Sequence, residues 1–328
     1  MVIKAKHIWA FFRLIRTPNI LMVVATQYLM RYCIIAPMMR SNGFDLQMSN
    51  FDFFLLVLAT VCLTAGGYII NDYFDRKADL VNRPGEVIVG LLIKSRWTMV
   101  FHILFNSIGI LSGIYLAFKI HALYLGILFI LGSGILWFYS TTYKKQLIIG
   151  NLIVSFSTGM VPVLVLLFEL PLLSARYGSI IDAMGINANQ LAGWILGFAI
   201  FGFLISLIRE IVKDAEDSEG DQAYGMQTLP IVVGTRWTKV ILYGLILIFL
   251  SGLVYVYRFH LRYDITLLYL LIFQLLPLAV IAILLYKADS KKSYRNISAI
   301  LKMMMLTGIS FAFVARYFIV NHYLIAQL

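Results

Sequence analysis

Acidic residues in this chain are concentrated in two short segments. Of its 16 Asp and Glu residues, ten lie within residues 71–86 and 209–221, although 61% of the chain is hydrophobic. The first segment reads Asn-Asp-Tyr-Phe-Asp-Arg-Lys-Ala-Asp from Asn71 to Asp79, and the second runs from Arg209 to Asp221. Carboxylates beside long apolar runs are costly and indicate a functional site. Hard oxygen ligands at this density predict that a divalent cation and phosphate groups bind here.

The spacing within each segment places its carboxylates on one face of a helix. At about 100° per residue, Asp72, Asp75 and Asp79 share a face, and Asn71 lies at its edge. Like charges at this spacing repel one another, so the helix needs a counter-cation. Mg²⁺ is the natural one because it takes hard oxygen ligands. The aligned residues of the second segment are Glu210, Asp214, Asp217 and Asp221.

A solvated acidic helix end is the alternative interpretation of each segment. It would require only scattered acidic residues, whereas two sets aligned on a face favour a site. Glu216 and Glu219 point away from the aligned face of the second segment. We therefore expect these two residues to be ordinary solvated charges.

Basic and amide residues near both segments are suited to bind phosphate oxygens. Lys144 follows an apolar run that ends near Tyr139, and Arg83 lies in the loop after the first segment. A lysine pair at the end of a span is typical of a topology anchor, but beside carboxylates Lys144 can also bind diphosphate as a point charge. For Asn151, packing and substrate contact are equally open. Arg209 and Lys213 can also bind diphosphate, whereas the position of Asn19 after Pro18 indicates only the start of a helix.

Long apolar runs predict the elements that position these residues. Only 13% of the residues are charged, against about 25% in soluble domains, which predicts a polytopic membrane protein. A span needs about 20 apolar residues, and continuous runs of this length favour helices over a β-barrel. The fold class is therefore all-α, with nine transmembrane helices in a single bundle. The spans are expected at roughly 17–38, 51–71, 98–118, 121–139, 147–170, 192–212, 238–257, 265–286 and 297–320.

The distribution of basic residues predicts the orientation of the chain. Most of the 27 Lys and Arg residues fall on one side if the N-terminus is cytoplasmic, and both acidic segments then face the cytoplasm. Because these basic residues are scattered at span ends, they indicate contact with membrane lipid and not with nucleic acid. Each acidic segment follows an even-numbered span. This predicts one domain, residues 1–328, built from two related halves at roughly 1–145 and 146–328.

The acidic segments resemble the motifs of a known family. Asn-Asp-x-x-Asp-x-x-x-Asp, followed by Asn82-Arg83-Pro84, resembles the first motif of the UbiA-type intramembrane prenyltransferases. The segment from Arg209 to Asp221, followed by Thr228-Leu229-Pro230, is similar to their second aspartate motif. Arg16-Thr17-Pro18-Asn19 and the stretch from Tyr139 to Asn151 resemble other parts of the family pattern. The resemblance covers nearly the whole chain.

The resemblance implies that both motifs face a central cavity and hold two Mg²⁺ ions. One ion would be held by Asn71, Asp72, Asp75 and Asp79, and the other by Asp214, Asp217 and Asp221 with Glu210. The ions would bind the diphosphate of a prenyl donor, and Lys144 and Arg83 would donate to the same oxygens. The catalytic residues would be Asp72, Lys144 and Arg83. The substrate-binding residues would be Asn19, Asn71, Arg83, Tyr139, Lys144, Asn151, Arg209 and Lys213.

The resemblance indicates the acceptor of the prenyl group less specifically than it indicates the type of reaction. The second motif most resembles that of the digeranylgeranylglyceryl phosphate synthases, which implies geranylgeranyl transfer to geranylgeranylglyceryl phosphate. The loop from Gly85 to Gly90 departs from the family pattern near the expected acceptor pocket. An aromatic acceptor of a quinone pathway is the alternative. A secondary transporter is a more distant one, because its carboxylates would more often lie in mid-span.

Overall fold

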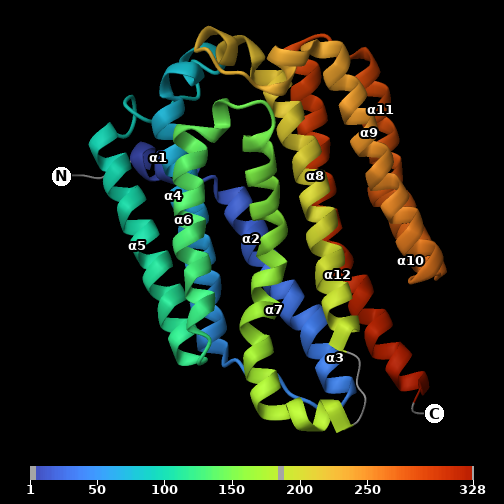
Figure 1. Cartoon of the computed structure of the whole chain (residues 1–328). Coiled ribbons are helices and arrows are strands. Elements are labelled where there is room, and N and C mark those ends of the chain that lie inside the picture. The colour runs from blue at the N-terminus through green and yellow to red at the C-terminus, as the bar shows by residue number, and fades with distance from the viewer. Residues whose placement is uncertain (1–4, 184–187, 327–328) are drawn as a thin grey trace. The chain divides into compact units, whose positions relative to one another are not determined.

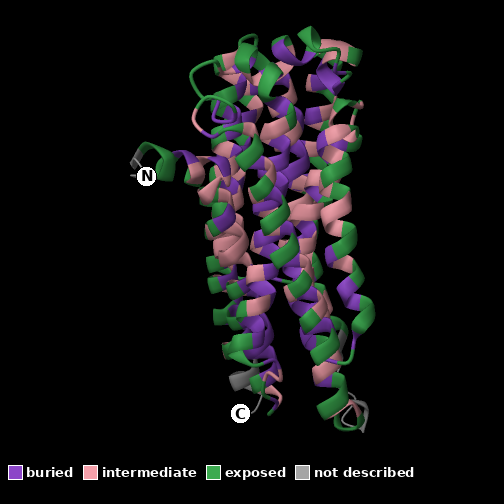
Figure 2. Ribbon diagram, turned by 90° about the vertical axis from the view of Figure 1, so that its left-hand side faces the viewer, coloured by how far each residue is buried: buried purple, intermediate pink, exposed green. Residues whose placement is uncertain are grey.

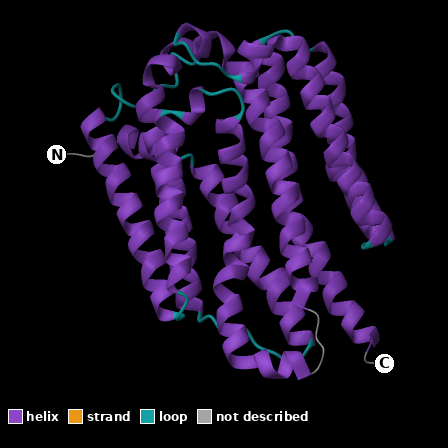
Figure 3. Ribbon diagram, viewed as in Figure 1, coloured by secondary structure: helices purple, strands orange, loops and turns teal. Residues whose placement is uncertain are grey.

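The structure, a computed structural model, describes residues 5–183 and 188–326. Within these ranges the chain forms helices and connecting loops without a β-strand (Figure 3). An isolated bridge between Val89 and Ile93 is the one β-type contact described there. The expected all-α fold class is therefore confirmed.

Nine of the described helical stretches are long and apolar enough to cross a membrane. All nine predicted spans are present, and most extend further than the apolar runs indicated. The second stretch, Asn50–Asn82, and the sixth, Asn189–Ala223, each continue through an acidic segment. The chain is an integral, multi-pass membrane protein. The nine stretches are Thr17–Ser41, Asn50–Asn82, Ser95–Lys119, Leu123–Thr141, Ile149–Ile180, Asn189–Ala223, Leu229–Phe259, Asp264–Lys287 and Lys291–Asn321.

The helices follow one another with short connections (Figure 1). Two single-turn π-helices interrupt the first and eighth spans, and one 3₁₀ turn begins the fourth span while another follows it. The elements are α1 (Ala5–Leu14), α2 (Thr17–Leu29), η1 (Met30–Ile35), α3 (Ala36–Ser41), α4 (Asn50–Asn82), α5 (Ser95–Lys119), η2 (Leu123–Gly126), α6 (Ile127–Thr141), η3 (Tyr143–Lys145), α7 (Ile149–Ala183), α8 (Ala188–Ala223), α9 (Leu229–Phe259), α10 (Asp264–Leu270), η4 (Leu271–Leu275), α11 (Leu276–Lys287) and α12 (Lys291–Ala326).

The chain folds into two compact units, which we describe separately. The first consists of Met1–Tyr28, Phe44–Lys144 and Leu164–Ala188. The second consists of Leu29–Gly43, Lys145–Val163 and Asn189–Leu328. The first acidic segment belongs to the first unit and the second acidic segment to the second.

In the first unit, α4 packs against both α5 and α6 (Figure 1). Gly109 and Gly113, four residues apart on α5, allow a close approach: a Cβ at Gly109 would lie 3.0 Å from the backbone oxygen of Ala59, and one at Gly113 would overlap the ring of Phe129. Small residues at this spacing are a common device for packing helices in membranes. The three helices therefore pack closely together, and one of them, α4, carries the first acidic segment.

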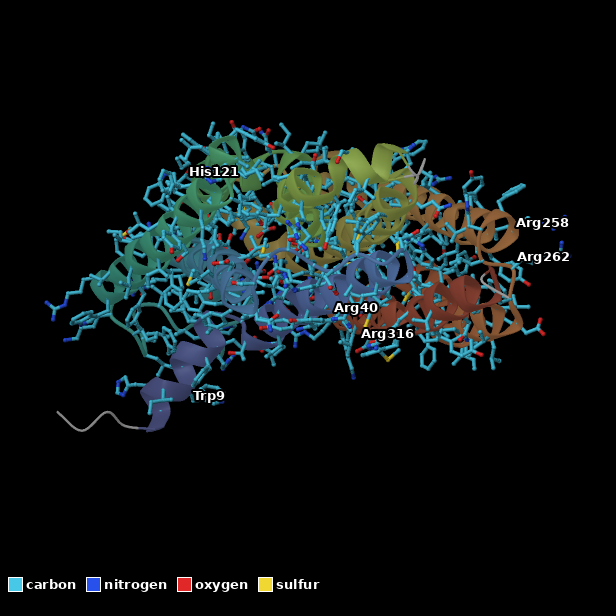
Figure 4. All side chains as sticks on the ribbon, turned by 90° about the horizontal axis from the view of Figure 1, so that it is seen from below. Trp9, Arg40, His121, Arg258, Arg262 and Arg316 are labelled. Atoms are coloured by element: carbon cyan, nitrogen blue, oxygen red, sulfur yellow. The ribbon has the colours of Figure 1, made fainter. Side chains whose placement is uncertain are left out.

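Helix α1 was not among the predicted elements. Its ten residues are too few for a span, and it precedes α2 with Arg16 in the left-handed backbone region at φ 52°. Ala10 and Leu14 are buried beside Ile69 of α4 and the loop residues Ile88, Val89 and Ile93. Trp9 is 54% exposed and projects from the ribbon (Figure 4), as expected for an aromatic anchor at a membrane surface.

In the second unit, a continuous apolar core joins four helices. Ile208 and Ile211 of α8 are buried with Leu242 of α9, Ile281 of α11 and Ile297 of α12. Exposed residues also lie along the helices (Figure 2), and many of them are large and apolar, as the hydrocarbon of a bilayer requires. Helix α8 is thus held by its buried face while its C-terminal turns carry the second acidic segment.

Candidate active site

The first acidic segment forms the C-terminal turns of α4. The helix begins at a good capping residue: Ser49 Oγ accepts from the backbone N–H of Asp52 at 3.1 Å. The Asp52 carboxylate also pairs with Lys119 Nζ at 2.7 and 2.9 Å. Asp75 follows Asp52 by a rise of about 34 Å along the helix, which roughly equals the thickness of a bilayer's hydrocarbon core. The acidic residues therefore reach the membrane surface opposite the Asp52–Lys119 pair.

Asp75 is the buried centre of this segment. Its Oδ2 accepts a hydrogen bond from Asn71 Nδ2 at 2.6 Å, one turn earlier on α4. The same oxygen pairs with Lys144 Nζ, which reaches it from the η3 turn after α6. The Asp75 side chain is 7% exposed, so this ion pair is largely removed from water. The structure thus brings together Asn71, Asp75 and Lys144, three of the residues predicted from sequence.

Asp72 has a separate basic partner. Its Oδ1 accepts from Arg16 Nη2 at 2.9 Å, and the pair is partly exposed. The Arg16 guanidinium also lies over the ring of Tyr68, 4.8 Å from its centroid. Asn19 Nδ2 donates to the Tyr68 hydroxyl at 3.2 Å. Tyr68 therefore connects the start of α2 to the acidic turns of α4.

The remaining predicted residues of the first unit lie at the ends of its helices. Asp79 is half-buried on α4, and its backbone oxygen accepts from the N–H of Arg83 at 2.7 Å. Arg83 therefore caps this helix with its main chain. Tyr139 lies on α6, five residues before Lys144.

The second acidic segment forms the C-terminal turns of α8. Asp214 Oδ2 accepts from Asn151 Nδ2 at 2.7 Å, which joins α8 to the start of α7. Glu210 Oε1 pairs with its chain neighbour Arg209 at 3.0 Å. Substrate contact was only one of two interpretations for Asn151, and the amide binds a carboxylate of the predicted site. The other members of the segment, Lys213, Asp217 and Asp221, lie on the same helix, where Asp221 is buried.

The expectation of a solvated Glu216 is wrong. Its residue is 5% exposed, and its Oε1 accepts from Arg295 Nε of α12 at 3.0 Å. A helical wheel shows the direction in which Glu216 points, but it does not show that α12 packs on that side of the helix. Glu219, by contrast, is exposed as expected. The Glu216–Arg295 pair ties the second acidic segment to the last helix of its unit.

The donor atoms of the first segment suit a hard cation. Asn71 Oδ1 is buried and accepts no hydrogen bond from the described part of the chain. It lies on the same helix turn as the Asp72 and Asp75 carboxylates, so amide and carboxylate oxygens are available together. Within residues 5–183 and 188–326, no group of three His, Cys, Asp or Glu side chains is arranged to hold a metal by protein atoms alone. Mg²⁺ commonly uses one or two carboxylates and completes its shell with water and substrate phosphates, so the residues present fit it.

The chain matches a known protein family over most of its length. Residues 33–314 match the model of the UbiA prenyltransferase family. The chain belongs to the UbiA prenyltransferase family. Both acidic segments and most of the spans lie within the matched residues.

Several UbiA relatives resemble the chain over much of its length. Digeranylgeranylglyceryl phosphate synthase of Methanosphaera stadtmanae is 30% identical over 80% of this chain and 88% of its own length. The enzyme of the same name from Methanothermobacter thermautotrophicus is 35% identical over 61% of this chain. The chain spans 63% of the length of that second relative, slightly less than two thirds.

Solved structures share the UbiA fold. One, from a study of digeranylgeranylglyceryl phosphate synthase in membranes, has a TM-score of 0.55 and 24% identity over 94% of this chain and 98% of its own. A UbiA homologue from Archaeoglobus fulgidus, bound to DMAPP and Mg²⁺, has a TM-score of 0.54 and 17% identity over 92% and 99%. A homologue from Aeropyrum pernix K1 has a TM-score of 0.60 and 12% identity over 87% and 96%.

Sequence reasoning missed two features of this UbiA site. Tyr68 lies four residues before Asp72, so helical spacing alone could have placed it on the same face. Arg295 lies 79 residues from its partner Glu216, and no local pattern connects them. The first was therefore available in the sequence, whereas the second needed the packing of α12.

Proposed function

We propose that this protein is an Mg²⁺-dependent membrane prenyltransferase. It transfers a geranylgeranyl group from a prenyl diphosphate to geranylgeranylglyceryl phosphate, a lipid acceptor, and releases diphosphate. The whole chain acts as a single domain built from two related halves. The observation that carries the proposal is the first acidic segment, where the carboxylates of Asp72 and Asp75 lie in contact with Arg16 and Lys144.

This arrangement suits the departure of a diphosphate. Carboxylates, an amide and basic side chains meet at the end of a span, where a lipid substrate places its headgroup. Asn71, Asp72, Asp75 and Asp79 hold one cation, and Glu210, Asp214, Asp217 and Asp221 hold a second. When bound, Mg²⁺ neutralises the charge that develops on the diphosphate as the C1–O bond breaks. The UbiA homologue of A. fulgidus with DMAPP and Mg²⁺ supports this assignment.

The basic and amide residues bind and orient the donor. Lys144 and Arg83 donate to diphosphate oxygens, and Arg209 and Lys213 supply further positive charge from the second segment. Asn19 and Asn151 hold neighbouring side chains in place through Tyr68 and Asp214. An aromatic ring such as that of Tyr139 would stabilise the positive charge that the allylic carbon carries as the bond breaks.

The transfer step replaces one C–O bond with another. The C1–O bond of the donor breaks, and its electron pair leaves with the diphosphate. The acceptor hydroxyl oxygen then forms a bond to C1, and its proton passes to a carboxylate. Asp72 is our choice for this base because its side chain is more exposed than that of Asp75 and can face an incoming hydroxyl.

The acceptor assignment rests on the relatives. Two proteins named digeranylgeranylglyceryl phosphate synthase are 30% and 35% identical to this chain. The active site faces the cytoplasm, because basic residues at the ends of spans favour the cytoplasmic side of the membrane. The lipid tails of donor and acceptor lie among the apolar faces of the helices.

A product analysis tests the proposal. Purified protein in lipid nanodiscs would receive geranylgeranyl diphosphate and Mg²⁺ with geranylgeranylglyceryl phosphate or hydroxybenzoate, and mass spectrometry would identify the product. We expect prenylation of the glycerol hydroxyl, and its loss with EDTA. Prenylation of the aromatic ring alone would replace the acceptor while keeping the reaction class. No diphosphate release with any acceptor would refute the enzyme assignment and favour a transporter.

A further inference from the structure

We propose that Arg16 and Lys144 are exchangeable counter-cations of the first acidic segment. They neutralise Asp72 and Asp75 while no divalent cation is bound, and a bound cation displaces them onto diphosphate oxygens. This inference rests on the proposed function, because it concerns the order in which the same site fills. Its consequence is that the divalent cation and the diphosphate strengthen each other's binding.

The carboxylate of Asp75 is already occupied by protein donors. Its Oδ2 accepts from both Asn71 and Lys144, so one oxygen of a carboxylate expected to bind a metal already has two donors. An ammonium group and a divalent cation repel each other and cannot share that oxygen. The side chain of Asp75 is 7% exposed and has little access to water as a substitute. A cation that takes Oδ2 of Asp75 therefore displaces Lys144.

Lys144 is built to move when it is displaced. It lies in a short 3₁₀ turn, and its side chain is a flexible stem with a compact charge at its end. The Lys144 side chain is 24% exposed while it pairs with Asp75. Once it is displaced from this nearly buried carboxylate, its ammonium group needs another anion. A diphosphate held at the same cation supplies one within reach.

Asp72 and Arg16 form a second carboxylate–cation pair, in which the cation also contacts an aromatic ring. The Arg16 guanidinium pairs with Asp72 at 2.9 Å and also lies 4.8 Å above the ring of Tyr68. The Tyr68 hydroxyl is in turn held by Asn19. When Asp72 turns to a metal, the aromatic face still holds Arg16 beside the site. Tyr68 is therefore a positioning residue that keeps the displaced cation available to a phosphate oxygen.

The two exchanges make binding mutually dependent. A metal that binds without diphosphate must separate the Arg16–Asp72 and Lys144–Asp75 ion pairs. A diphosphate that binds without metal is repelled by carboxylates, which are also negatively charged. Together they replace two carboxylate–cation pairs with metal–carboxylate and cation–phosphate contacts. Coupling between two ligands of this kind commonly changes each affinity by about 5- to 150-fold.

Binding of Mn²⁺, measured by electron paramagnetic resonance, tests the exchange without a turnover assay. Purified protein in nanodiscs would be titrated with Mn²⁺, with and without a non-reactive geranylgeranyl thiodiphosphate. For the native chain we expect weak Mn²⁺ binding that the analogue strengthens at least about fivefold. Lys144→Met should bind Mn²⁺ at least about fivefold more tightly without the analogue, because the competing ammonium is gone, and should gain less when the analogue is added.

The adjacent Lys145 provides the matched control. Its side chain is exposed, and Lys145→Met removes the same charge from the same turn. Its Mn²⁺ binding should remain native, and Arg16→Gln should behave like Lys144→Met. Unchanged or weaker Mn²⁺ binding in both Lys144→Met and Arg16→Gln would overturn the exchange, even if prenyl transfer is intact. Native coupling in a protein that transfers no prenyl group would refute the proposed function and leave the exchange standing.

Discussion

At the scale of single residues, each acidic segment contains carboxylates with little access to water and others that are more open. Asp75 is buried in contact with Lys144, and Glu216 and Asp221 are buried in the second segment. A buried carboxylate can hold a cation strongly only while its partners stay in place, because an unpaired buried charge is costly. Function at these positions should therefore depend on charge and not only on shape.

The corresponding prediction compares Asp75 and Asp217 with Glu219. Asp75→Asn and Asp217→Asn keep the side-chain shape but remove a charge from each segment. We expect each to lower kcat for prenyl transfer at least about 100-fold, or roughly 3 kcal/mol of barrier. Glu219→Gln removes an exposed charge from the same helix and should retain native turnover. Rates would be followed by released diphosphate, and a normal kcat in either Asp variant would contradict the site.

Two substitutions at Tyr68 distinguish the role of its hydroxyl, which contacts Asn19, from the role of its ring, which contacts Arg16. Tyr68→Phe removes the hydroxyl that binds Asn19 but keeps the ring beneath Arg16, whereas Tyr68→Leu removes both. A neutral hydrogen bond contributes about 0.5–1.5 kcal/mol and a cation–π contact about 0.5–2 kcal/mol. We expect KM for the donor to rise at least about fivefold more in the Leu variant than in the Phe variant. Tyr115→Leu, at an exposed position on α5, is the control, and equal effects of the two Tyr68 variants would exclude a role for the ring face.

At the scale of elements, the sequence predicted the long helices well because their signal is local. Apolar runs of sufficient length require helices in lipid, and the helical spacing correctly extended α4 and α8 through their acidic segments. It did not predict α1, whose ten residues are held by contacts with α4 and the loop after it. Nor could it predict the π-helical turns, or the contact of Glu216 with α12, because these depend on neighbours distant in sequence.

Packing of α4, α5 and α6 depends on a glycine that faces a rigid side chain. Gly113→Ala would place a Cβ inside the ring of Phe129, which is 2% exposed and also packs against Phe168. Overpacking of this kind typically costs about 1–3 kcal/mol, so thermal unfolding in detergent should occur at a lower temperature. Gly134→Ala, on α6 with open space around its Cβ, should be tolerated or slightly stabilising. Equal melting temperatures for the two variants would show that α5 does not approach α6 this closely.

At the scale of the whole molecule, the resemblance to a family and the physical pattern of the chain led to the same fold class. Composition and span count predicted a polytopic helical protein, and family membership followed from motifs that the helices place at span ends. The division into related halves stays a prediction, because the compact units are each assembled from several stretches of the chain. Assembly from separated stretches is a tertiary property, and span order alone does not reveal it.

The orientation of the chain in the membrane stays a prediction, and it is based on the distribution of charge. The loop after α4 and the turn after α6 carry Arg83 and Lys144, whereas the turn between α5 and α6 lies beside the paired Lys119. The positive-inside rule therefore predicts that the first acidic segment faces the cytoplasm. In a variant whose two native cysteines, Cys33 and Cys62, are replaced by alanine, single cysteines would report the two sides.

Gly85→Cys, in the open loop after α4, and Tyr124→Cys, at a 67% exposed position in η2, are suitable. In intact cells a membrane-impermeant maleimide should label Tyr124→Cys and leave Gly85→Cys unlabelled, and both should react once the cells are opened. The second condition shows that each thiol is accessible, so absence of labelling in intact cells reports the membrane barrier. The reverse pattern would place the carboxylates of α4 outside the cytoplasm. A prenyl diphosphate made in the cytoplasm could then reach them only after crossing the bilayer, against the cost of moving its charge through hydrocarbon.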